Sequence, residues 1–311
     1  MRVFVTGATG FIGSAIVSEL IGAGHRVLGL ARSDAAAASL KAVGAEVHRG
    51  ALDDPDSLKR GAEASDGVIH AAFVHDFLSD NSVRDFSSLY LAAAETDRRA
   101  IETLGLALAG SDRPLVVTSG TALLAPNRLG TEDDGPDPAS SAAPRVASEE
   151  TTLSMASRGV RASVVRLPPS VHGDGDRGFV PGLINFAREK AVSGYVGEGF
   201  NRWPAVHRLD AAVLYRLALE SAPAGSRLHA VAEEGVALRD IAIAIGRHLN
   251  VPVVSVPSAR AGDHFGWLTN FIAMDNPTSS SLTRKRVGWR PAQRDLIQDL
   301  DQGSYFDSRK S

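Results

Sequence analysis

The sequence predicts an α/β protein built on a doubly wound parallel sheet. Short apolar segments of strand length alternate with longer segments of helical periodicity in the first half of the chain. The first strand-like segment, residues 2–5, runs directly into the glycine-rich stretch VTGATGFIGS, residues 5–14. With 311 residues, 44% of them hydrophobic, the chain can bury a sizeable core. Such alternation gives parallel strands joined by right-handed crossovers, with helices on both faces.

The predicted elements follow one another in order. After the strand at residues 2–5, apolar residues recur at helical spacing over residues 11–24. Further strands are predicted at residues 25–31, 45–50, 66–72, 113–119 and 161–167, and helices at residues 33–44, 54–64, 89–109 and 147–157. Because ligands of such sheets bind beyond the carboxyl ends of the strands, we expect the functional site there.

The second half of the chain is less regular and rich in proline and glycine. We expect a nucleotide-binding domain over residues 1–168 and a smaller, discontinuous substrate lobe over residues 169–311, with the helix near residues 209–222 returning to the main sheet. The acidic loop at residues 127–144 is either a solvated surface loop or an active-site lid. One apolar set either lines a pocket or forms the core of the small lobe: Trp203, Phe265, Trp267, Phe271 and Met274.

Composition excludes several classes of protein. The formal net charge of −3 gives no electrostatic footprint for nucleic acid or an anionic membrane surface. The absence of cysteine rules out a disulfide framework and thiolate zinc sites. No metal-binding motif is present, and no apolar run approaches the roughly 20 residues of a membrane helix. With a strand beginning at residue 2, we expect no signal peptide and a soluble, cytoplasmic protein.

The glycines at residues 7, 10 and 13 have a physical reading of their own. In a tight turn between a buried strand and a helix, Gly7 lets the chain reverse and Gly10 lets the backbone approach a pyrophosphate. Gly13 lets the helix pack closely on the strand. Free N–H groups at the start of the helix favour an anion. An ordinary tight turn is the alternative.

Several stretches together resemble the short-chain dehydrogenase/reductase superfamily, in its extended, epimerase/dehydratase-like branch. They are TGATGFIG, VIHAA, VVTSG, VVRLPPSVHGDGD, RWPAVHRLDAA and TRKRVGWRP, and they span nearly the whole chain. The resemblance implies a Rossmann domain that binds NAD or NADP and a small C-terminal substrate domain. It also implies a set of cofactor-binding residues: Gly7, Thr9, Gly10 and Gly13 at the pyrophosphate, Phe11 and Ile12 as backbone donors, Leu52 at the adenine, His70, Ala71 and Ala72 beside the adenosine ribose, and Pro168, Ser170 and Val171 next to the nicotinamide.

The end of the second predicted strand favours NADP over NAD. A free ribose 2′-hydroxyl favours a carboxylate there, whereas a 2′-phosphate favours a cation. The sequence has Ala31 at that point, followed by Arg32 and Ser33, whose guanidinium and hydroxyl suit a phosphate. The alternative is a solvated Arg32, with Ser33 or Asp34 capping the next helix.

The catalytic residues of the resembled family are missing. Its Tyr-x-x-x-Lys pair lies on the helix before the sixth strand, where this chain has Arg145 and Glu149. None of the four tyrosines has a lysine four residues later. Arg145 either clamps a carboxylate or oxyanion, or forms a helical ion pair with Glu149.

Other side chains are candidates for the remaining catalytic roles. Ser119 and Thr121 flank the position of the family's usual serine, and His75 and His172 have pKa values suited to proton transfer. The candidate catalytic residues are therefore Thr121, Ser119, Arg145 and His75, without a metal. For two further residues we expect structural roles: His207 in the substrate lobe or at a substrate polar group, and Asp210 as the cap of the following helix.

The function that these observations predict is the NADP(H)-dependent reduction of a carbonyl-type group on a small organic molecule. Two alternatives remain open: a non-catalytic NADP(H)-binding redox sensor, and an epimerase or dehydratase of the sugar-nucleotide type. Members of the resembled family commonly pair through the helices that here cover residues 89–109 and 147–157. We therefore expect a homodimer.

Overall fold

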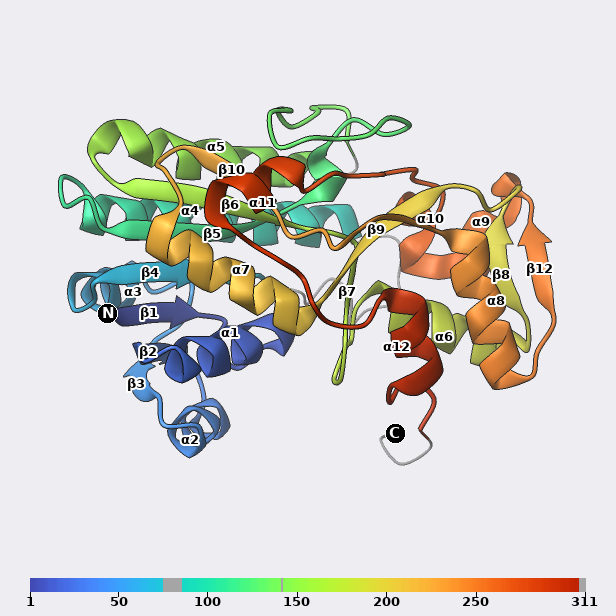
Figure 1. The fold of residues 1–311 in the computed structure, drawn as a ribbon, viewed down its shortest axis with the longest axis horizontal. Helices are drawn as coiled ribbons and strands as arrows, with labels where there is room; N and C mark the ends of the chain where they lie inside the picture. The colour runs from blue at the N-terminus through green and yellow to red at the C-terminus, as the bar shows by residue number, and fades with distance from the viewer. Residues whose placement is uncertain (75–85, 141, 308–311) are drawn as a thin grey trace.

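The main sheet of the computed structural model has seven parallel strands in the order β10-β6-β5-β4-β1-β2-β3 (Figure 1). The structure describes residues 1–74, 86–140 and 142–307. The strands of this sheet are β1 (Arg2–Thr6), β2 (Arg26–Ala31), β3 (Glu46–Arg49), β4 (Gly67–His70), β5 (Pro114–Gly120), β6 (Arg161–Leu167) and β10 (Ser226–His229). The predicted doubly wound parallel sheet is confirmed.

Helices cover both faces of this sheet, because successive side chains along each strand point to opposite faces and both faces are apolar. Val3 and Val5 belong to a core with helices α1 (Phe11–Gly22), α2 (Asp34–Ala42) and α7 (Arg208–Ser221). Phe4, between them in β1, belongs to the opposite core with α3 (Pro55–Glu63), α4 (Phe86–Leu108) and a short turn that follows α5 (Val146–Ser154). Strands buried on both faces read as continuous apolar runs, which is why the sequence predicted them.

The second lobe has its own core beside the carboxyl edge of the main sheet (Figure 1). Its strands form two small sheets, β11 (Glu233–Ala237), β9 (Arg202–His207) and β7 (Ser170–His172) in one, β12 (Val253–Val256) and β8 (Ser193–Val196) in the other. Its helices are α6 (Phe179–Lys190), α8 (Leu238–Leu249), α9 (Ala261–Phe265), α10 (Thr269–Ile272) and α12 (Leu296–Gln302). Trp203, Phe265 and Phe271 are buried in this core, so they pack the lobe and do not line an open pocket.

Late segments of the chain return to the main sheet. Helix α7 packs along α1, and β10 pairs with β6 to form the edge of the sheet. Helix α11 (Ser281–Val287) packs against β10. The return of β10 and α11 was not foreseen from the sequence, and it places residues from the last third of the chain close to the ends of β5 and β6.

The acidic loop after β5 is anchored in its described part. Backbone N–H groups of Asn127 and Gly130 donate to the carbonyls of Asp275 and Pro277, each at 2.8 Å. Glu132 is 1% exposed and accepts hydrogen bonds from Thr283. A freely solvated loop is therefore the wrong description, because the C-terminal segment holds this stretch in place.

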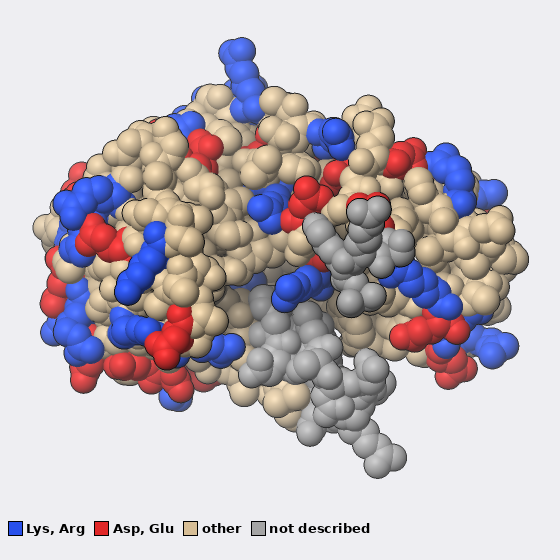
Figure 2. Space-filling model, turned by 90° about the horizontal axis from the view of Figure 1, so that it is seen from below, with Lys and Arg blue, Asp and Glu red and all other residues tan. Residues whose placement is uncertain are grey.

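Charged residues of both signs intermingle on the face seen from below (Figure 2). This distribution agrees with the small net charge. Within the described residues, no helix combines the length and apolarity needed to cross a membrane.

Candidate nucleotide-binding and active site

The glycine-rich loop lies between β1 and α1, and its backbone leaves no room for larger residues. Gly7 has φ +66°, and a Cβ there would lie 2.7 Å from the backbone nitrogen of Ala72. A Cβ on Gly13 would lie 1.9 Å from the carbonyl oxygen of Gly7, closer than real atoms approach. The loop is thus packed against itself and against the segment after β4, as a close backbone turn requires.

The first turn of α1 presents N–H groups to the outside. Gly10 is the N-cap residue, and no side chain caps this helix. Thr9 and Gly10 are exposed, while Phe11 and Ile12 are half-buried. Uncapped N–H groups and the helix dipole make such an end a site for phosphate groups. The geometry can therefore hold the diphosphate of a nucleotide.

The end of β2 carries one cation that faces solvent. Arg32 is exposed and forms no ion pair with any residue that the structure describes. The Ser33 hydroxyl accepts a hydrogen bond from the Ala36 N–H at 3.2 Å, so Ser33 caps α2, as the alternative interpretation held. Arg32 therefore keeps its whole side chain available for a phosphate, and the Ser33 hydroxyl keeps its O–H as a donor.

Other predicted contacts of the cofactor lie around this loop. Leu52 is half-buried and packs against the core that contains Phe4, on the face of the sheet covered by α3 and α4. Ala71 and Ala72 are half-buried beside Gly7. His70 is fully buried. Its Nδ1 lies 2.8 Å from the Thr6 hydroxyl and its Nε2 lies 3.0 Å from Asp97 Oδ1. With both ring nitrogens engaged, His70 has no side-chain group left for a ligand.

Asp97, on α4, connects His70 to Arg145. Its Oδ2 lies 3.5 Å from the Arg145 guanidinium. Burial alone would raise the pKa of Asp97, but the Arg145 charge and the His70 hydrogen bond hold that pKa below its usual value. A buried carboxylate of this kind stays ionised and fixes its cation. Asp97 was not singled out in the sequence, because no local pattern connects it with residue 145.

Arg145 ends a short 3₁₀ turn just before α5, at the carboxyl edge of β5. Its Nη2 donates to the Thr118 carbonyl at 2.9 Å, and its guanidinium lies 4.3 Å from the centre of the Phe73 ring. Its Nε is buried without a hydrogen-bond partner among the described residues. The alternative surface ion pair with Glu149 is wrong, because each residue pairs elsewhere.

Glu149 is buried on the other side of α5. Its carboxylate accepts from Arg166 Nε at 3.0 Å, from Arg227 Nε at 3.1 Å and from the Ser119 hydroxyl at 2.7 Å. Burial works against ionisation, yet the two guanidinium groups and the hydroxyl keep the pKa of Glu149 lowered. The residue at the position of the family's lysine is therefore part of a buried structural cluster.

Two of the other predicted catalytic groups, Ser119 and Thr121, lie at the end of β5 and already donate hydrogen bonds to protein groups. The Thr121 hydroxyl donates to Asn276 Oδ1 at 2.8 Å, and both residues are buried. The Ser119 hydroxyl is taken up by Glu149. These contacts place both hydroxyls at the end of β5 but occupy their protons, so their catalytic roles stay predictions. His75 lies outside the described residues.

Tyr90 is a candidate that sequence reasoning missed. It lies on α4, is 9% exposed and meets the Phe73 ring edge-on, with centroids 6.2 Å apart. Burial raises the pKa of Tyr90, the Arg145 charge opposes that shift and the Asp97 charge adds to it. A search for a lysine four residues after a tyrosine does not find it, because its cation comes from another helix.

The segment after β6 leads into the second lobe. Pro168 and Ser170 are buried, Val171 is half-buried, and the Ser170 hydroxyl has no partner in the described part of the chain. His172 is fully buried, with Nδ1 2.9 Å from Asp299 Oδ2. This contact ties the strand to α12 and gives His172 a structural partner.

His207 and Asp210 exchange the roles that the sequence suggested. The His207 ring accepts the Leu209 N–H at 3.2 Å and so caps α7. Asp210, expected as the cap, is buried and accepts the N–H groups of Ala292 and Gln293 at 2.9 and 3.0 Å. Its position one turn further along the chain was too close to distinguish from sequence alone.

Comparison with known proteins identifies the relationship. The family described as the NAD dependent epimerase/dehydratase family matches residues 3–231. The chain belongs to this family. An uncharacterized protein of Schizosaccharomyces pombe is 53% identical over 98% of this chain and 100% of its own length. A 4-hydroxy-2-methyl-3-oxo-4-farnesyl-3,4-dihydroquinoline-1-oxide ketoreductase of Stigmatella aurantiaca is 28% identical over 86% of this chain and 80% of its own.

The same fold occurs in solved structures of this epimerase/dehydratase type. A double mutant of the dTDP-glucose 4,6-dehydratase of Streptomyces venezuelae, solved with NAD bound, has a TM-score of 0.77. The match covers 99% of this chain and 98% of the other at 18% identity. The resemblance noted from the sequence is thereby confirmed at the level of family and fold.

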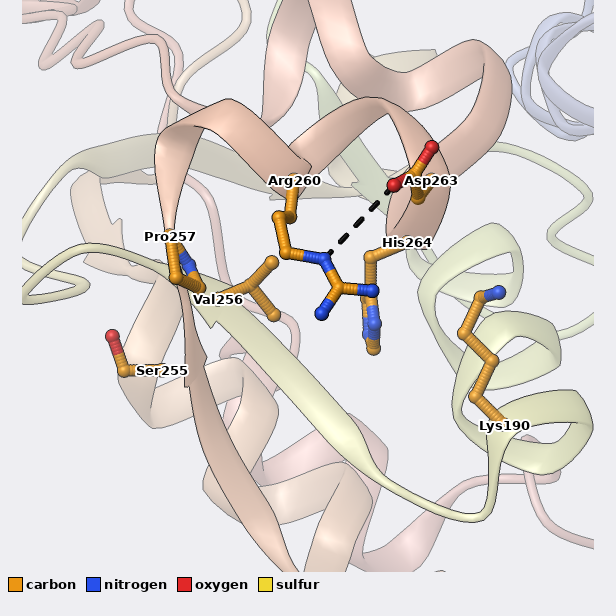
Figure 3. A pocket seen from close by; sticks show the side chains of 7 residues that line it. All are labelled: Lys190, Ser255, Val256, Pro257, Arg260, Asp263 and His264. Atoms are coloured by element: carbon orange, nitrogen blue, oxygen red, sulfur yellow. Dashed lines mark ion pairs between the residues drawn. The ribbon is translucent and has the colours of Figure 1, made fainter.

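Two cavities lie in the second lobe of this family member. One, of about 520 Å³, is lined by residues around the start of α7 and by α12, among them Asp174, His207 and Asp299. The other, of about 330 Å³, lies where Lys190, Arg260 and His264 come together, with an Arg260–Asp263 ion pair at its rim (Figure 3). The second cavity is formed entirely by residues of the second lobe.

Proposed function

We propose that this protein is an NADP(H)-dependent oxidoreductase that reduces a carbonyl-type group on a small organic molecule. The observation that carries the proposal is the placement of Arg145 at the carboxyl edge of β5, held by the Thr118 carbonyl and Asp97, with a buried Nε that has no partner among the described residues. Membership of the family and the ketoreductase name of one relative support it.

The chain has the residues to hold the dinucleotide. The uncapped first turn of α1 and the glycine-rich loop fit the diphosphate, and Arg32 fits a 2′-phosphate. When bound, the nicotinamide supplies the hydride for the reduction. The backbone around Ala71 and Ala72, Pro168 and Val171 would lie along the remainder of the cofactor, as the family resemblance implies.

Arg145 would stabilise the charge that develops during reduction. A carbonyl that accepts a hydride builds negative charge on its oxygen, and a fixed guanidinium at that position lowers the barrier. Asp97, Thr118 and Phe73 fix the guanidinium before substrate arrives, so little reorganisation is needed. Arginine stays protonated, so another group must supply the proton.

Tyr90 is our candidate for that proton donor. Its ring packs on the same Phe73 that lies under Arg145, and the Arg145 charge opposes the rise in the Tyr90 pKa that burial causes. The pair Tyr90 and Arg145 would then divide between two helices the work that the family's tyrosine and lysine do on one.

The test measures hydride transfer from NADPH to a panel of ketones and aldehydes, with NADPH binding measured separately by calorimetry. We expect Arg145→Ala to lower kcat by about tenfold to a thousandfold while NADPH affinity stays nearly unchanged. Arg247→Ala, which removes an exposed arginine of α8 that pairs with Asp301, is the matched control and should be silent. Full activity of Arg145→Ala on a substrate that the wild type reduces would refute the site. NADPH binding without turnover of any substrate would instead favour a sensor.

We also propose that the protein is a homodimer paired through α4 and α5. Leu91 and Leu106 on α4 are 56% and 49% exposed. A second copy packed on this helix would bury them. A monomeric mass by light scattering at micromolar concentration would contradict the proposal.

A further inference from the structure

Helices α1 and α7 lie side by side and run in the same direction (Figure 1). Arg216 of α7 pairs with Glu19 of α1 at 2.7 Å. Eight residues earlier on each helix, the guanidinium of Arg208 lies over the ring of Phe11, 5.3 Å from its centre. The equal spacing of the two contacts shows that the helices pack in parallel. Both N-termini therefore lie at the same edge of the molecule.

Arg208 is held at the first turn of α1. It is half-buried, and its Nη1 donates to the carbonyl of Asp174 at 2.6 Å. A Cβ on Gly173 would lie 3.1 Å from the Arg208 side chain, so the loop after β7 closes around its aliphatic part. These contacts come from two separate elements, α1 and the loop after β7, and they fix the direction of the guanidinium.

The charge of Arg208 has no carboxylate partner in the described part of the protein. Most other half-buried arginines here do have one, as Arg216 shows with Glu19 and Glu220. The neighbouring end of α1 adds further positive potential, because its N–H groups are uncapped and its dipole points outward. Two sources of positive potential side by side, with Arg208 not paired to a carboxylate of the described residues, favour an anionic ligand between them.

We infer that Arg208 contacts the diphosphate of the bound dinucleotide, as a cation from α7 that completes the site made by the glycine-rich loop. The inference rests on the proposed function in that it takes the dinucleotide as the ligand. The loop supplies backbone N–H groups, whereas Arg208 supplies a full charge and a planar pair of donors. Its role differs from that of Arg32, since every nucleotide with a diphosphate contains the group that Arg208 would bind.

The test compares three ligands, NADPH, NADH and ADP, by calorimetry on purified protein. Arg208→Gln should weaken all three by a similar factor, about tenfold to a hundredfold, as expected for loss of a charge-assisted contact. Arg208→Met keeps the aliphatic packing on Phe11 and should lose the same affinity, while Arg208→Lys should recover part of it. Arg216→Gln, on the same helix, removes a cation that already has two carboxylates and is the matched control.

The outcomes separate the inference from the proposed function. If the wild type binds none of the three ligands, the proposed function is wrong and the inference falls with it. If the wild type binds them and Arg208→Gln still binds ADP within about twofold of it, only the inference is wrong, and Arg208 serves to hold the loop after β7. A loss confined to NADPH would likewise overturn the inference, because it would assign Arg208 to the 2′-phosphate.

Discussion

The two ends of the candidate site are built from different materials. At the nucleotide end, a short run of backbone makes the shape, and Gly7 and Gly13 matter for the side chains that they lack. At the reaction end, side chains make the shape, and Arg145 depends on Asp97 from α4 and on the Thr118 carbonyl from β5. The first end is local in sequence, and the second is assembled from three distant segments. A backbone site can thus be kept by three glycines, whereas a side-chain site needs every partner in place.

The largest effect should come from filling the backbone turn. Gly13→Val would place side-chain atoms against the Gly7 carbonyl, where even a Cβ would be 1.9 Å away. We expect dinucleotide affinity to fall by at least about a hundredfold, with lower thermal stability. Gly22→Ala, at the end of the same helix with no atom within 4 Å of its Cβ, should keep binding and stability. Calorimetry and thermal unfolding of both variants measure this, and tight binding by Gly13→Val would show that the turn is not the site.

The next largest effect concerns the stability of the buried cluster around Glu149, measured without reference to activity. Glu149→Gln leaves the fully buried Arg166 without its carboxylate, which should lower the free energy of unfolding by about 3 to 5 kcal/mol. Glu150→Gln changes the exposed neighbour and should stay within about 0.5 kcal/mol of the wild type. Urea unfolding compares the two. Equal stabilities would mean that the buried cluster does not support this end of the sheet.

We expect the free energy of unfolding to depend on pH through Asp176, which lies in the loop after β7. Burial raises the pKa of Asp176 to about 6, although Gly178 and Tyr305 donate hydrogen bonds to its carboxylate. Because this pKa exceeds the unfolded value of about 4, the unfolded chain loses the proton at a lower pH than the folded protein does. The free energy of unfolding therefore falls by up to about 3 kcal/mol as the pH rises from 4 to 6. Asp176→Asn lacks this loss. Its stability relative to the wild type should therefore rise from pH 4 to pH 6 in thermal unfolding, and a pH-independent difference would count against the assignment.

The smallest effect sharpens the nucleotide end. Arg32 is exposed, so water and salt screen its charge, and we expect Arg32→Ala to weaken NADPH by about tenfold while leaving NADH unchanged. Calorimetry with both cofactors measures the ratio. If wild-type protein binds NADPH and NADH equally, the preference for NADP is refuted and Arg32 is a solvated residue.

The sequence allowed more to be predicted for the fold and the nucleotide end than for the reaction end. The strands of the main sheet and the glycine turn have local signatures, namely apolar runs and fixed glycine spacing. Asp97, Tyr90 and Arg208 have none, because their partners lie on other elements of the chain, as Arg145 does for Asp97, 48 residues away, and Phe11 of α1 does for Arg208. The i, i+4 spacing of Arg145 and Glu149 predicted an ion pair that the structure does not have, because the sequence does not reveal the distant buried partners of either residue.

The anchoring of the acidic loop and of β6 by late residues has a consequence for synthesis on the ribosome. Glu132 and Arg166 are both buried in the folded protein. Their partners are made much later in synthesis: Glu132 accepts a hydrogen bond from Thr283, and Arg166 lies 3.2 Å from His229 on β10. At roughly 5 to 20 residues per second, a chain that has just made β6 waits on the order of ten seconds for Thr283 to emerge. During that interval the nascent domain holds charged groups without their final partners. Its N-terminal half should therefore mature late, and it would benefit from protection by chaperones until the final turns of the chain arrive.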